Sequence, residues 1–349
     1  MWSCAFLLFL HSVVTDLPTL VKDARAVITT AGPFQKHGST VVEFCAKYGT
    51  HYVDITGESD WVKTMILQWE ATAQKTGAKI ISMCGHDSIP WDLTVMKLEE
   101  ALPSGEELAS VECLDEVAGA ISGGTANTIM MSTDGSGIPS PKFAYDPFLR
   151  LPNGSKSTST STHQLSLLVR RSTPINGRVA STYSSLFIMS VVNAEIVKRS
   201  VALRQKSKNV TYREFQVSPD FKTAFCNQFG VIAFVTALFN PITCYLLKLV
   251  LPRAGEGPSR ESMEKGYLAI SAEGLGSKGT KVQSLIYFSR DAGYLDTARM
   301  VAESGLTLAL DSNKLSPGGG FFTPATGMGN VLLDRLCRTG TSFAVSVKP

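Results

Sequence analysis

Three short runs of apolar and β-branched residues alternate with helix-like stretches in the first third of the chain, and this alternation constrains the fold most. The runs cover Ala26–Thr30, His51–Ile55 and Ala78–Met83. Between them, Ser39–Tyr48 and Trp61–Thr76 carry apolar residues at helical spacing, and a glycine follows each stretch. Strands joined by short helical crossovers pair in parallel. The sequence therefore predicts part of a doubly wound sheet.

A second pattern follows the first. Glu112–Val117, Tyr267–Ala272 and Val282–Ser289 look like strands, and the last two are typical of an antiparallel second domain. Helices are expected at about Tyr294–Leu310 and at Asn330–Arg338. The predicted fold class is therefore α/β, with a parallel sheet followed by a domain whose sheet is mostly antiparallel.

Ligands of doubly wound sheets bind beyond the carboxyl ends of the strands. Three loops occupy those ends here: Gly32–Gly38, Thr56–Ser59 and Cys84–Asp92. Asp54 and Glu58 could position a ligand at this edge, and the alternative is a turn with solvated carboxylates. The sequence places the candidate functional site at these three loops.

The loop after the third run contains the densest polar cluster of the chain. His86, Asp87 and Ser88 are its candidate catalytic residues, on a wall of a cofactor or substrate cleft. The competing interpretation is structural, because Asp87 or Ser88 could cap a helix that carries Pro90 in its first turn. Their order does not indicate a catalytic triad, since adjacent residues need not converge.

Gly274–Gly279 matches the Gly-x-Gly-x-x-Gly pattern, but its context does not fit a dinucleotide site. Such a site needs a helix after the last glycine, whose amino end holds the pyrophosphate. Thr280–Phe288 follows instead, with alternating and β-branched residues, so we expect a hairpin turn. No other glycine fingerprint precedes the three parallel strands.

The cysteine, histidine and charge patterns exclude several other classes. The chain has seven cysteines, all isolated, and five histidines, none in a His-Glu-x-x-His spacing. This pattern favours a reducing compartment and no metal site. The net charge of +3 is too small to indicate nucleic-acid binding.

A long apolar segment, Ala224–Leu247, has no charged residue and lies between Lys222 and Lys248. It is long enough to span a bilayer, but Asn240 and Pro241 interrupt it. A hairpin in one leaflet or a buried helix pair fits better. Six basic residues upstream would favour anionic lipid, or else form a solvated helix face: Lys198, Arg199, Arg204, Lys206, Lys208 and Arg213. The sequence favours peripheral attachment to a membrane through residues 198–248.

The motifs of the chain, taken in order, resemble the saccharopine dehydrogenase-like oxidoreductase family, which includes the trans-acting enoyl reductases of glycolipid synthesis. The resemblance covers about Ser12 to Pro349. The motifs that carry it are Ala31–Phe34, His51–Glu58, Cys84–Leu93, Ser122–Thr125, Gly255–Ser259, Asp291–Tyr294, Thr297–Val301 and Gly319–Ala325.

This resemblance implies a Rossmann-type domain that binds NADP or NAD and a second domain that covers the nicotinamide. The chain departs from the family at His86, where a phenylalanine is usual. The implied divisions are 1–110 for an incomplete NAD(P)-binding domain, 111–292 for a substrate or lid domain with the apolar segment 224–247, and 293–349 for carboxyl-terminal helices packed on the first domain. The implied cofactor-binding residues are Gly32, Pro33, Phe34, Gly57, Glu58, Gly85 and Asp87.

The front of the chain departs from the family more strongly. The family begins with a strand, a glycine-rich turn and a helix, whereas His11–Asp16 looks like the tail of a third strand and Met1–Leu10 matches nothing. We therefore expect an amino-terminal truncation, with the first two strands missing beside Ala26–Thr30. Because that turn and its helix dipole hold the pyrophosphate, we expect this chain to bind NADP or NAD poorly.

Two functions follow as hypotheses. The first is an NAD(P)H-dependent oxidoreductase that reduces a lipid-linked, enoyl-type substrate in lipid or glycolipid metabolism. The alternative is a catalytically inactive membrane or lipid-droplet protein that retains the fold; a saccharopine dehydrogenase of lysine metabolism ranks third, since that enzyme is soluble. The resemblance also implies membrane association on the cytoplasmic side, at a lipid droplet or organelle membrane, and leaves a homodimer open.

Overall fold

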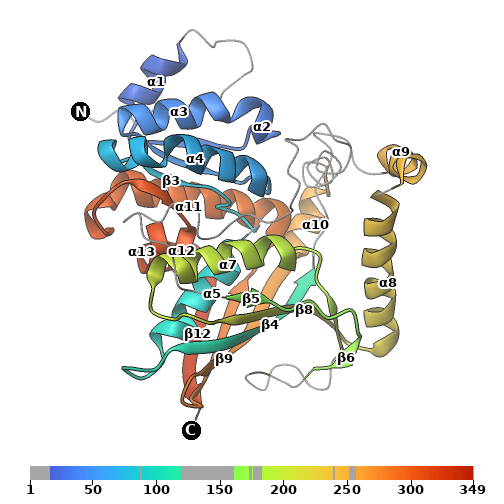
Figure 1. The fold of residues 1–349 in the computed structure, drawn as a ribbon. Helices are drawn as coiled ribbons and strands as arrows, with labels where there is room; N and C mark the ends of the chain where they lie inside the picture. The colour runs from blue at the N-terminus through green and yellow to red at the C-terminus, as the bar shows by residue number, and fades with distance from the viewer. Residues whose placement is uncertain are drawn as a thin grey trace.

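The computed structural model describes residues 16–86, 88–118, 161–172, 175, 183–238, 240–250 and 257–348. These residues form two β-sheets with helices packed on and between them (Figure 1). Asp87, Ser122–Thr125 and the first residues of the Gly255–Ser259 motif lie outside the described residues, as does His11–Thr15. The candidate site is therefore built from the remaining motif residues.

Sheet A contains four parallel strands in the order β1-β2-β3-β11. Three of them confirm the strands and the parallel pairing that the sequence predicts. The fourth, β11, comes from near the carboxyl end of the chain and pairs with β3. The bounds are Ala26–Thr29 (β1), His51–Asp54 (β2), Lys79–Ile81 (β3) and Gly320–Phe322 (β11).

The crossover helices of sheet A also confirm the prediction. Gly49 and Gly77 end α3 and α4 because each adopts the left-handed conformation, with φ of 78° and 85°. Pro90 lies in the first turn of α5, where its missing N–H breaks no helical hydrogen bond. The bounds are Leu17–Asp23 (α1), Phe34–His37 (α2), Ser39–Tyr48 (α3), Ser59–Thr76 (α4) and Ile89–Glu100 (α5).

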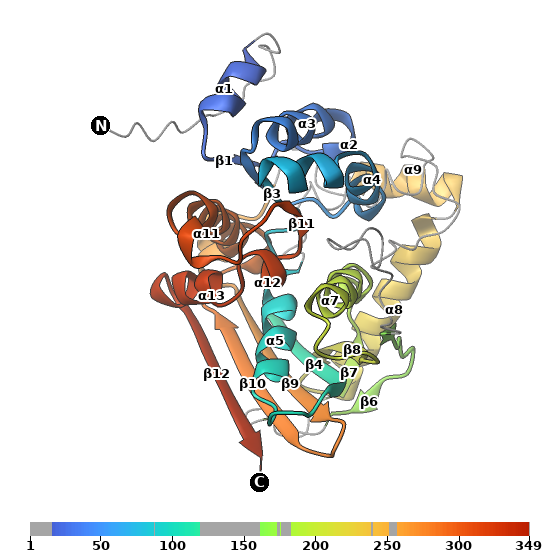
Figure 2. The same ribbon diagram turned by 60° about the vertical axis from the view of Figure 1, so that its left-hand side comes forward.

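Sheet B contains eight strands, in the order β12-β10-β9-β4-β8-β7-β6, with β5 also paired to β8. Its pairs are antiparallel except at β4–β8 and β5–β8, which confirms a mostly antiparallel second sheet. The edge strand β12, which lies along β10 in Figure 2, is not in the sequence prediction. The bounds are Leu108–Ala118 (β4), Thr162–His163 (β5), Arg170–Arg171 (β6), Tyr183–Leu186 (β7), Thr211–Ser218 (β8), Tyr267–Gly276 (β9), Lys281–Phe288 (β10) and Thr341–Lys348 (β12).

Helices join the two sheets into one body. Figure 2 shows α5 and α7 over the inner face of sheet B, with α11, α12 and α13 between the sheets. One apolar core continues from Val53 and Ile81 in sheet A to Leu268 and Ile286 in sheet B. The remaining bounds are Ser190–Arg204 (α7), Arg260–Lys265 (α10), Ala292–Asp296 (η1), Thr297–Leu310 (α11), Ser312–Lys314 (η2), Pro324–Gly327 (α12) and Gly329–Arg338 (α13).

The domain divisions stay a prediction, because the carboxyl-terminal segment enters both sheets. Residues 293–349 supply β11 to sheet A and β12 to sheet B, in addition to the expected helices. Among these helices, α11 packs against β1 and β2. Sheet B begins at Leu108, just before the predicted boundary.

β1 forms an edge of sheet A, and no strand within the described residues pairs with its outer side. The side chain of Ile28 is 38% exposed at this edge. Gly305 allows α11 to approach β1 closely, because a Cβ atom at this position would collide with Ile28. The observed edge agrees with the expectation for Ala26–Thr30.

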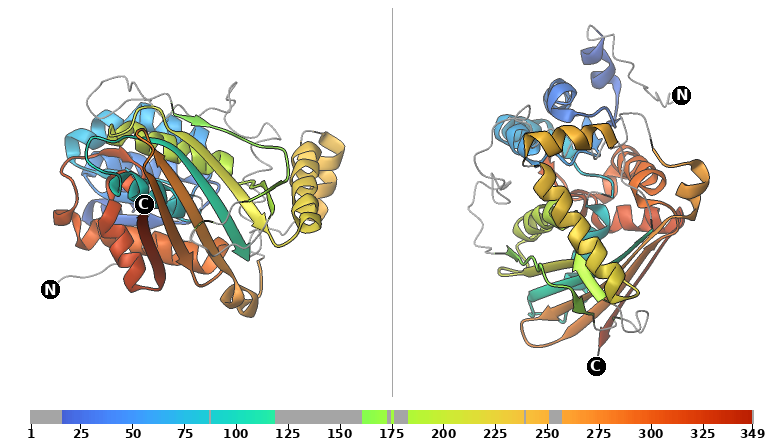
Figure 3. Two further views of the ribbon diagram at one scale, coloured as in Figure 1. Left: turned by 90° about the horizontal axis from the view of Figure 1, so that it is seen from below. Right: turned by 90° about the vertical axis from the view of Figure 1, so that its right-hand side faces the viewer.

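The apolar segment forms α8 (Phe221–Leu238) and α9 (Pro241–Val250), which stand at one side of the molecule (Figure 3). The alternative of a buried helix pair is wrong, since Phe225, Phe229 and Ile242 are 54%, 63% and 73% exposed. α8 packs on β7, and α9 packs on α8. The two helices are exposed, and α9 lies across the end of α8 (Figures 1 and 2).

The basic residues upstream do not all face solvent, which corrects one expectation. Arg199 is buried, and its guanidinium donates to the carbonyl oxygen of Phe321 at 2.9 Å. Arg204 donates to Glu99 at 2.7 Å. These two side chains hold α7 in place and are not available to lipid headgroups, whereas Lys206 and Lys208 are exposed.

Candidate active site

The site residues expected from the sequence gather where β1, β2 and β3 end. Parallel strands bring the loops after Thr29, Asp54 and Ile81 to one edge of sheet A. This is the edge at which doubly wound sheets bind ligands. The loops themselves are held by a small set of polar side chains, and those contacts decide which groups remain for a ligand.

Asp54 is fully buried and holds two of the loops together. Its Oδ1 atom accepts hydrogen bonds from the backbone N–H groups of Thr56 and Met83, each at 3.0 Å. Its Oδ2 atom accepts from Ser82 at 3.0 Å. Burial raises the pKa of Asp54 to about 6, although these hydrogen bonds favour the charged form. Asp54 is therefore a structural residue rather than a ligand group.

Glu58 holds the loop after β1. Its two carboxylate oxygens accept the backbone N–H groups of Phe34 and Gln35 at 2.9 and 2.8 Å. These amides form the amino end of α2, where an anion would otherwise bind. The Phe34 side chain is buried against Trp61, with the ring centroids 5.7 Å apart. Glu58 and Phe34, both predicted to bind the cofactor, are therefore hydrogen-bonded to each other through the Phe34 backbone N–H.

The other predicted cofactor residues differ in exposure. Gly32 is exposed and Pro33 is half-buried at the tip of the first loop. Nothing lies within 4 Å of the position that a Cβ atom would take at Gly57, so this residue borders open space. Gly85 is buried, and a Cβ atom there would come within 2.9 Å of Thr297. Gly32, Pro33 and Gly57 leave the backbone accessible at this edge.

Ser88 belongs to the turn that starts α5. Its side chain is buried and donates to the carbonyl oxygen of Met83 at 3.1 Å. The backbone N–H of His86 donates to the Thr297 hydroxyl at 3.0 Å, which fixes the same turn from α11. Among the described candidate catalytic residues, Ser88 is therefore engaged within the protein.

His86 retains an unused polar atom. Its Nε2 is buried, and the described residues offer it no hydrogen-bond partner. The ring packs on Trp91 with the centroids 5.1 Å apart. Burial lowers the pKa of His86 to about 4, so the imidazole is neutral at physiological pH. It can donate or accept one hydrogen bond but cannot serve as a cationic acid.

A pair of buried carboxyl groups, Asp115 and Glu214, lies next to this loop and is absent from the sequence prediction. Trp91 donates its indole N–H to Asp115 at 3.1 Å. Glu214 accepts from Tyr212 at 2.6 Å and from Asn193 at 2.7 Å. The sequence signal that could have indicated the pair is that Asp115 and Glu214 each lie at a buried position of a strand, β4 and β8.

The described residues do not fit the pyrophosphate of a dinucleotide. Glu58 occupies the first amides of α2. The Gly274–Gly279 motif forms the β9–β10 hairpin turn, as expected, and the N–H groups of Lys278 and Thr280 donate to Glu106. At these two places the described residues therefore leave no free backbone amides for a pyrophosphate.

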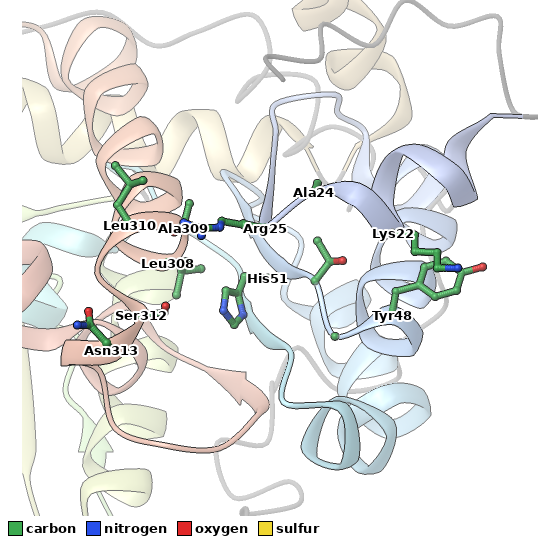
Figure 4. A pocket seen from close by; sticks show the side chains of 12 residues that line it. Lys22, Ala24, Arg25, Tyr48, His51, Leu308, Ala309, Leu310, Ser312 and Asn313 are labelled. Atoms are coloured by element: carbon green, nitrogen blue, oxygen red, sulfur yellow. Dashed lines mark hydrogen bonds between the residues drawn. The ribbon is translucent and has the colours of Figure 1, made fainter. Parts of the chain in front are cut away.

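A pocket of about 490 Å³ lies at the opposite edge of sheet A (Figure 4). Arg25, at the amino end of β1, and His51, at that of β2, line it with the last turn of α11. The Arg25 guanidinium donates to the Ala309 carbonyl oxygen across it at 3.1 Å. Because ligands of this fold bind at the carboxyl edge, this pocket is separate from the candidate active site.

Comparison with known proteins places the chain among enzymes. No protein-family model matches it. A trans-acting enoyl reductase of Mycobacterium tuberculosis is 31% identical over 340 residues, which cover 93% of this chain and 81% of the relative. That of Mycobacterium ulcerans is 31% identical over 339 residues, with the same coverage.

A second Mycobacterium tuberculosis protein, provisionally named a trans-acting enoyl reductase, is 31% identical over 346 residues, covering 95% of this chain and 82% of that protein. Among solved structures, the L-glutamate-forming saccharopine dehydrogenase of Saccharomyces cerevisiae aligns with a TM-score of 0.53 at 12% identity. The alignment covers 95% of this chain and 87% of the yeast chain. This structural likeness concerns the fold.

Proposed function

The chain belongs to the saccharopine dehydrogenase-like family of oxidoreductases, which includes the trans-acting enoyl reductases, and we propose that it reduces the carbon–carbon double bond of a lipid-linked enoyl substrate. The observation that carries this proposal is the 31% identity to named trans-acting enoyl reductases over 93% of the chain. The proposed setting is lipid or glycolipid metabolism.

The proposed reaction takes place at the carboxyl edge of sheet A. Reduction of an enoyl group adds a hydride to one carbon and a proton to the other, and a bound nicotinamide cofactor, NADP or NAD, supplies the hydride. The accessible backbone at Gly32, Pro33 and Gly57 would contact the nicotinamide end. The neutral His86, whose Nε2 is buried, borders this edge from the loop before α5.

We also propose that this chain holds the cofactor weakly. Dinucleotide affinity depends strongly on backbone amides and a helix dipole at the pyrophosphate. Glu58 already occupies the amino end of α2, and the glycine motif at Gly274–Gly279 gives its N–H groups to Glu106. With contacts to the nicotinamide alone, the dissociation constant of the cofactor would lie well above the micromolar range.

The test is cofactor oxidation by the full chain with a panel of enoyl thioesters and enoyl lipids. We expect turnover with at least one enoyl substrate, at a rate that keeps rising as NADPH increases beyond micromolar concentrations. The saturated analogues of the same substrates are the control and should give no oxidation. The absence of turnover on the whole panel would contradict the proposed reaction.

A second candidate function is a membrane or lipid-droplet protein that retains the fold without catalysis. The observation that favours it is the exposed apolar face of α8 and α9, which includes Phe225, Phe229, Ile242 and Tyr245. Among the described helices, only α8 is long and apolar enough to cross a membrane. Since α9 turns away across the end of α8 and does not extend it, we propose that the two helices rest within one leaflet rather than span the membrane.

Vesicle flotation tests this surface. The chain should float with vesicles of phosphatidylcholine and phosphatidylserine, and the double variant Phe225→Asp/Phe229→Asp should remain in the soluble fraction. Leu67→Asp, on the exposed face of α4, is the matched control and should still float. Equal flotation of the double variant would exclude this surface. A dimer in light scattering that the double variant converts to monomer would assign the face to a second copy of the chain instead.

A further inference from the structure

The Asp115–Glu214 pair is a buried acidic cluster that the proposed reaction does not use. β4 and β8 are parallel neighbours with Cys113 opposite Glu214, so Cys113, Asp115, Tyr212 and Glu214 share one face of sheet B. Asp115 is 0% exposed and Glu214 is 2% exposed. Both carboxyl groups are therefore buried close enough for each to act on the charge of the other.

No cation within the described residues compensates this pair. The groups that act on it are Trp91 from α5, Asn193 from α7, Tyr212 from β8 and Cys113 from β4. Burial raises the pKa values of Cys113 and Tyr212 well above their usual values, so both are neutral at pH 7. Two buried carboxylates without a counter-ion cannot both ionise at low cost.

Burial and mutual repulsion therefore leave a proton on the pair. The pKa of Asp115 is raised well above its usual value by burial and by the Glu214 carboxylate. Burial raises the pKa of Glu214 to about 7. Apolar residues in this position would be at least as stable, so fold stability alone does not explain the pair.

Trp91 connects the pair to the candidate active site. Its indole N–H donates to Asp115, and its ring packs on the ring of His86. Phe187 packs on Trp91 with ring centroids 5.8 Å apart, which leaves the indole little freedom. The Trp91 indole therefore contacts both the Asp115 carboxyl and the His86 ring, so it is the direct connection between them.

We propose that Asp115 and Glu214 are positioning residues that act on His86 through Trp91 and make the cleft loop sensitive to pH. With one shared proton the carboxyl groups stay close and Trp91 keeps its place. When that proton is lost, repulsion separates the two carboxylates, Asp115 shifts, and Trp91 carries the shift to His86. The nearby His163, whose ring lies 6.0 Å from that of Tyr212, has its pKa lowered to about 4 by burial and by Lys198 and stays neutral in this range.

The experiment follows the indole N–H resonance of Trp91, assigned with Trp91→Phe, as pH rises from about 5 to about 9. We expect one titration near neutral pH. Asp115→Asn keeps an oxygen for the indole and should abolish the titration. Glu214→Gln removes the like charge and should move the midpoint to lower pH. Glu116→Gln, an exposed position on the same strand, should leave the midpoint unchanged.

Two results would overturn the inference: a Trp91 resonance that does not titrate in this range, or one that titrates identically in Asp115→Asn. This measurement needs no turnover, so its result does not depend on whether the proposed reduction occurs. The inference rests on the proposed function only in treating the loop at His86 as part of the active site. Where turnover is measured, the pH profile of kcat/KM should lose its neutral-pH limb in Asp115→Asn, with KM changed less than kcat.

Discussion

The carboxylates at the carboxyl edge of sheet A bind the protein's own backbone. Asp54 joins the loop after β2 to the turn at Met83, and Glu58 joins that same loop to the start of α2. Each carboxylate satisfies two backbone N–H groups. At the residue scale, the site is therefore a rigid frame in which few polar atoms lack a hydrogen-bond partner. Among the described residues at this edge, the main one is Nε2 of His86.

Replacing Glu58 tests this frame. Glu58→Ala leaves the N–H groups of Phe34 and Gln35 without their partner, and hydrogen bonds to a charged group contribute about 1.5–3 kcal/mol each. Because Glu58 is half-buried and water can replace part of this, we expect the free energy of unfolding to fall by about 1–3 kcal/mol in urea denaturation.

Two variants serve as comparisons for Glu58→Ala. Glu58→Gln keeps one acceptor oxygen and should cost less than the alanine variant. Glu43→Ala removes an exposed i,i+4 ion pair with Lys47 and should change the free energy of unfolding by less than about 0.5 kcal/mol. Equal stability of the alanine variant and the native chain would mean that Glu58 does not hold the loop.

The sequence predicts which loops gather at the carboxyl edge of sheet A but does not assign the roles of their side chains. Strand order and loop position follow from periodicity, so Gly32, Gly57 and His86 lie where expected. The role of Glu58 depends on partners in another loop, Phe34 and Gln35, and no local pattern encodes it. The Asp115–Glu214 pair escapes prediction for the same reason, since the two residues meet only when β4 and β8 pair.

Close backbone contacts determine how the carboxyl-terminal elements join sheet A. β11 adds to β3, and the buried Glu70 of α4 accepts the N–H of Phe321 at 3.0 Å. Gly319 precedes this strand, and a Cβ atom there would collide with the carbonyl oxygen of Ala73 and the backbone of Gly77. At the element scale, glycine is required here by proximity to α4.

Gly319→Ala should therefore separate β11 from α4. We expect the free energy of unfolding to fall by about 1–3 kcal/mol or more, since backbone cannot yield as a flexible side chain does. Gly230→Ala is the matched control within α8, because nothing lies within 4 Å of its Cβ position. That variant should raise the stability by about 0.5–1 kcal/mol through helix propensity. Unchanged stability and an unchanged melting temperature in Gly319→Ala would contradict the contact.

Long, periodic elements are predicted well and short or distant ones are not. α3 begins at Ser39 and ends at Tyr48 as predicted, because its apolar spacing and Gly49 mark it locally. β11 has only three residues, and β12 is mostly exposed, so neither shows a burial pattern. The orientation of α8 also escapes the sequence, since a uniformly apolar helix has no side that periodicity can assign.

The whole molecule is built so that sheet B supports the functional edge of sheet A. A continuous core links the sheets, and α5 begins at the cleft loop and ends against β9 and β10. Buried acids lie along this junction: Asp92 accepts from Ser200 and from the backbone of Ala325, and burial raises its pKa to about 6. The junction is therefore where protonation and stability are coupled.

This coupling predicts how stability depends on pH. Asp54, Asp92 and Glu214 have pKa values above those of the unfolded chain, so the native state binds more protons near neutrality. The contribution of these three acids to the free energy of unfolding should fall as pH rises from about 4 toward 7, whereas the neutral buried His86 and His163 contribute stability that rises over this interval. Urea midpoints of the native chain and Glu214→Gln therefore isolate the acid contribution. The stability of Glu214→Gln relative to the native chain should increase with pH over this range, and a difference that does not change with pH would contradict the assignment.

We propose that this oxidoreductase holds its cofactor mainly through the nicotinamide end, because Glu58 occupies the first amides of α2 among the described residues. Comparing NADPH with reduced nicotinamide mononucleotide as hydride donors for an enoyl thioester tests it most directly. The account predicts that both donors support reduction, with kcat/KM values within about tenfold of each other, a difference of about 1.4 kcal/mol. A preference for NADPH by several orders of magnitude with a micromolar KM, or no reduction with either donor, would contradict it.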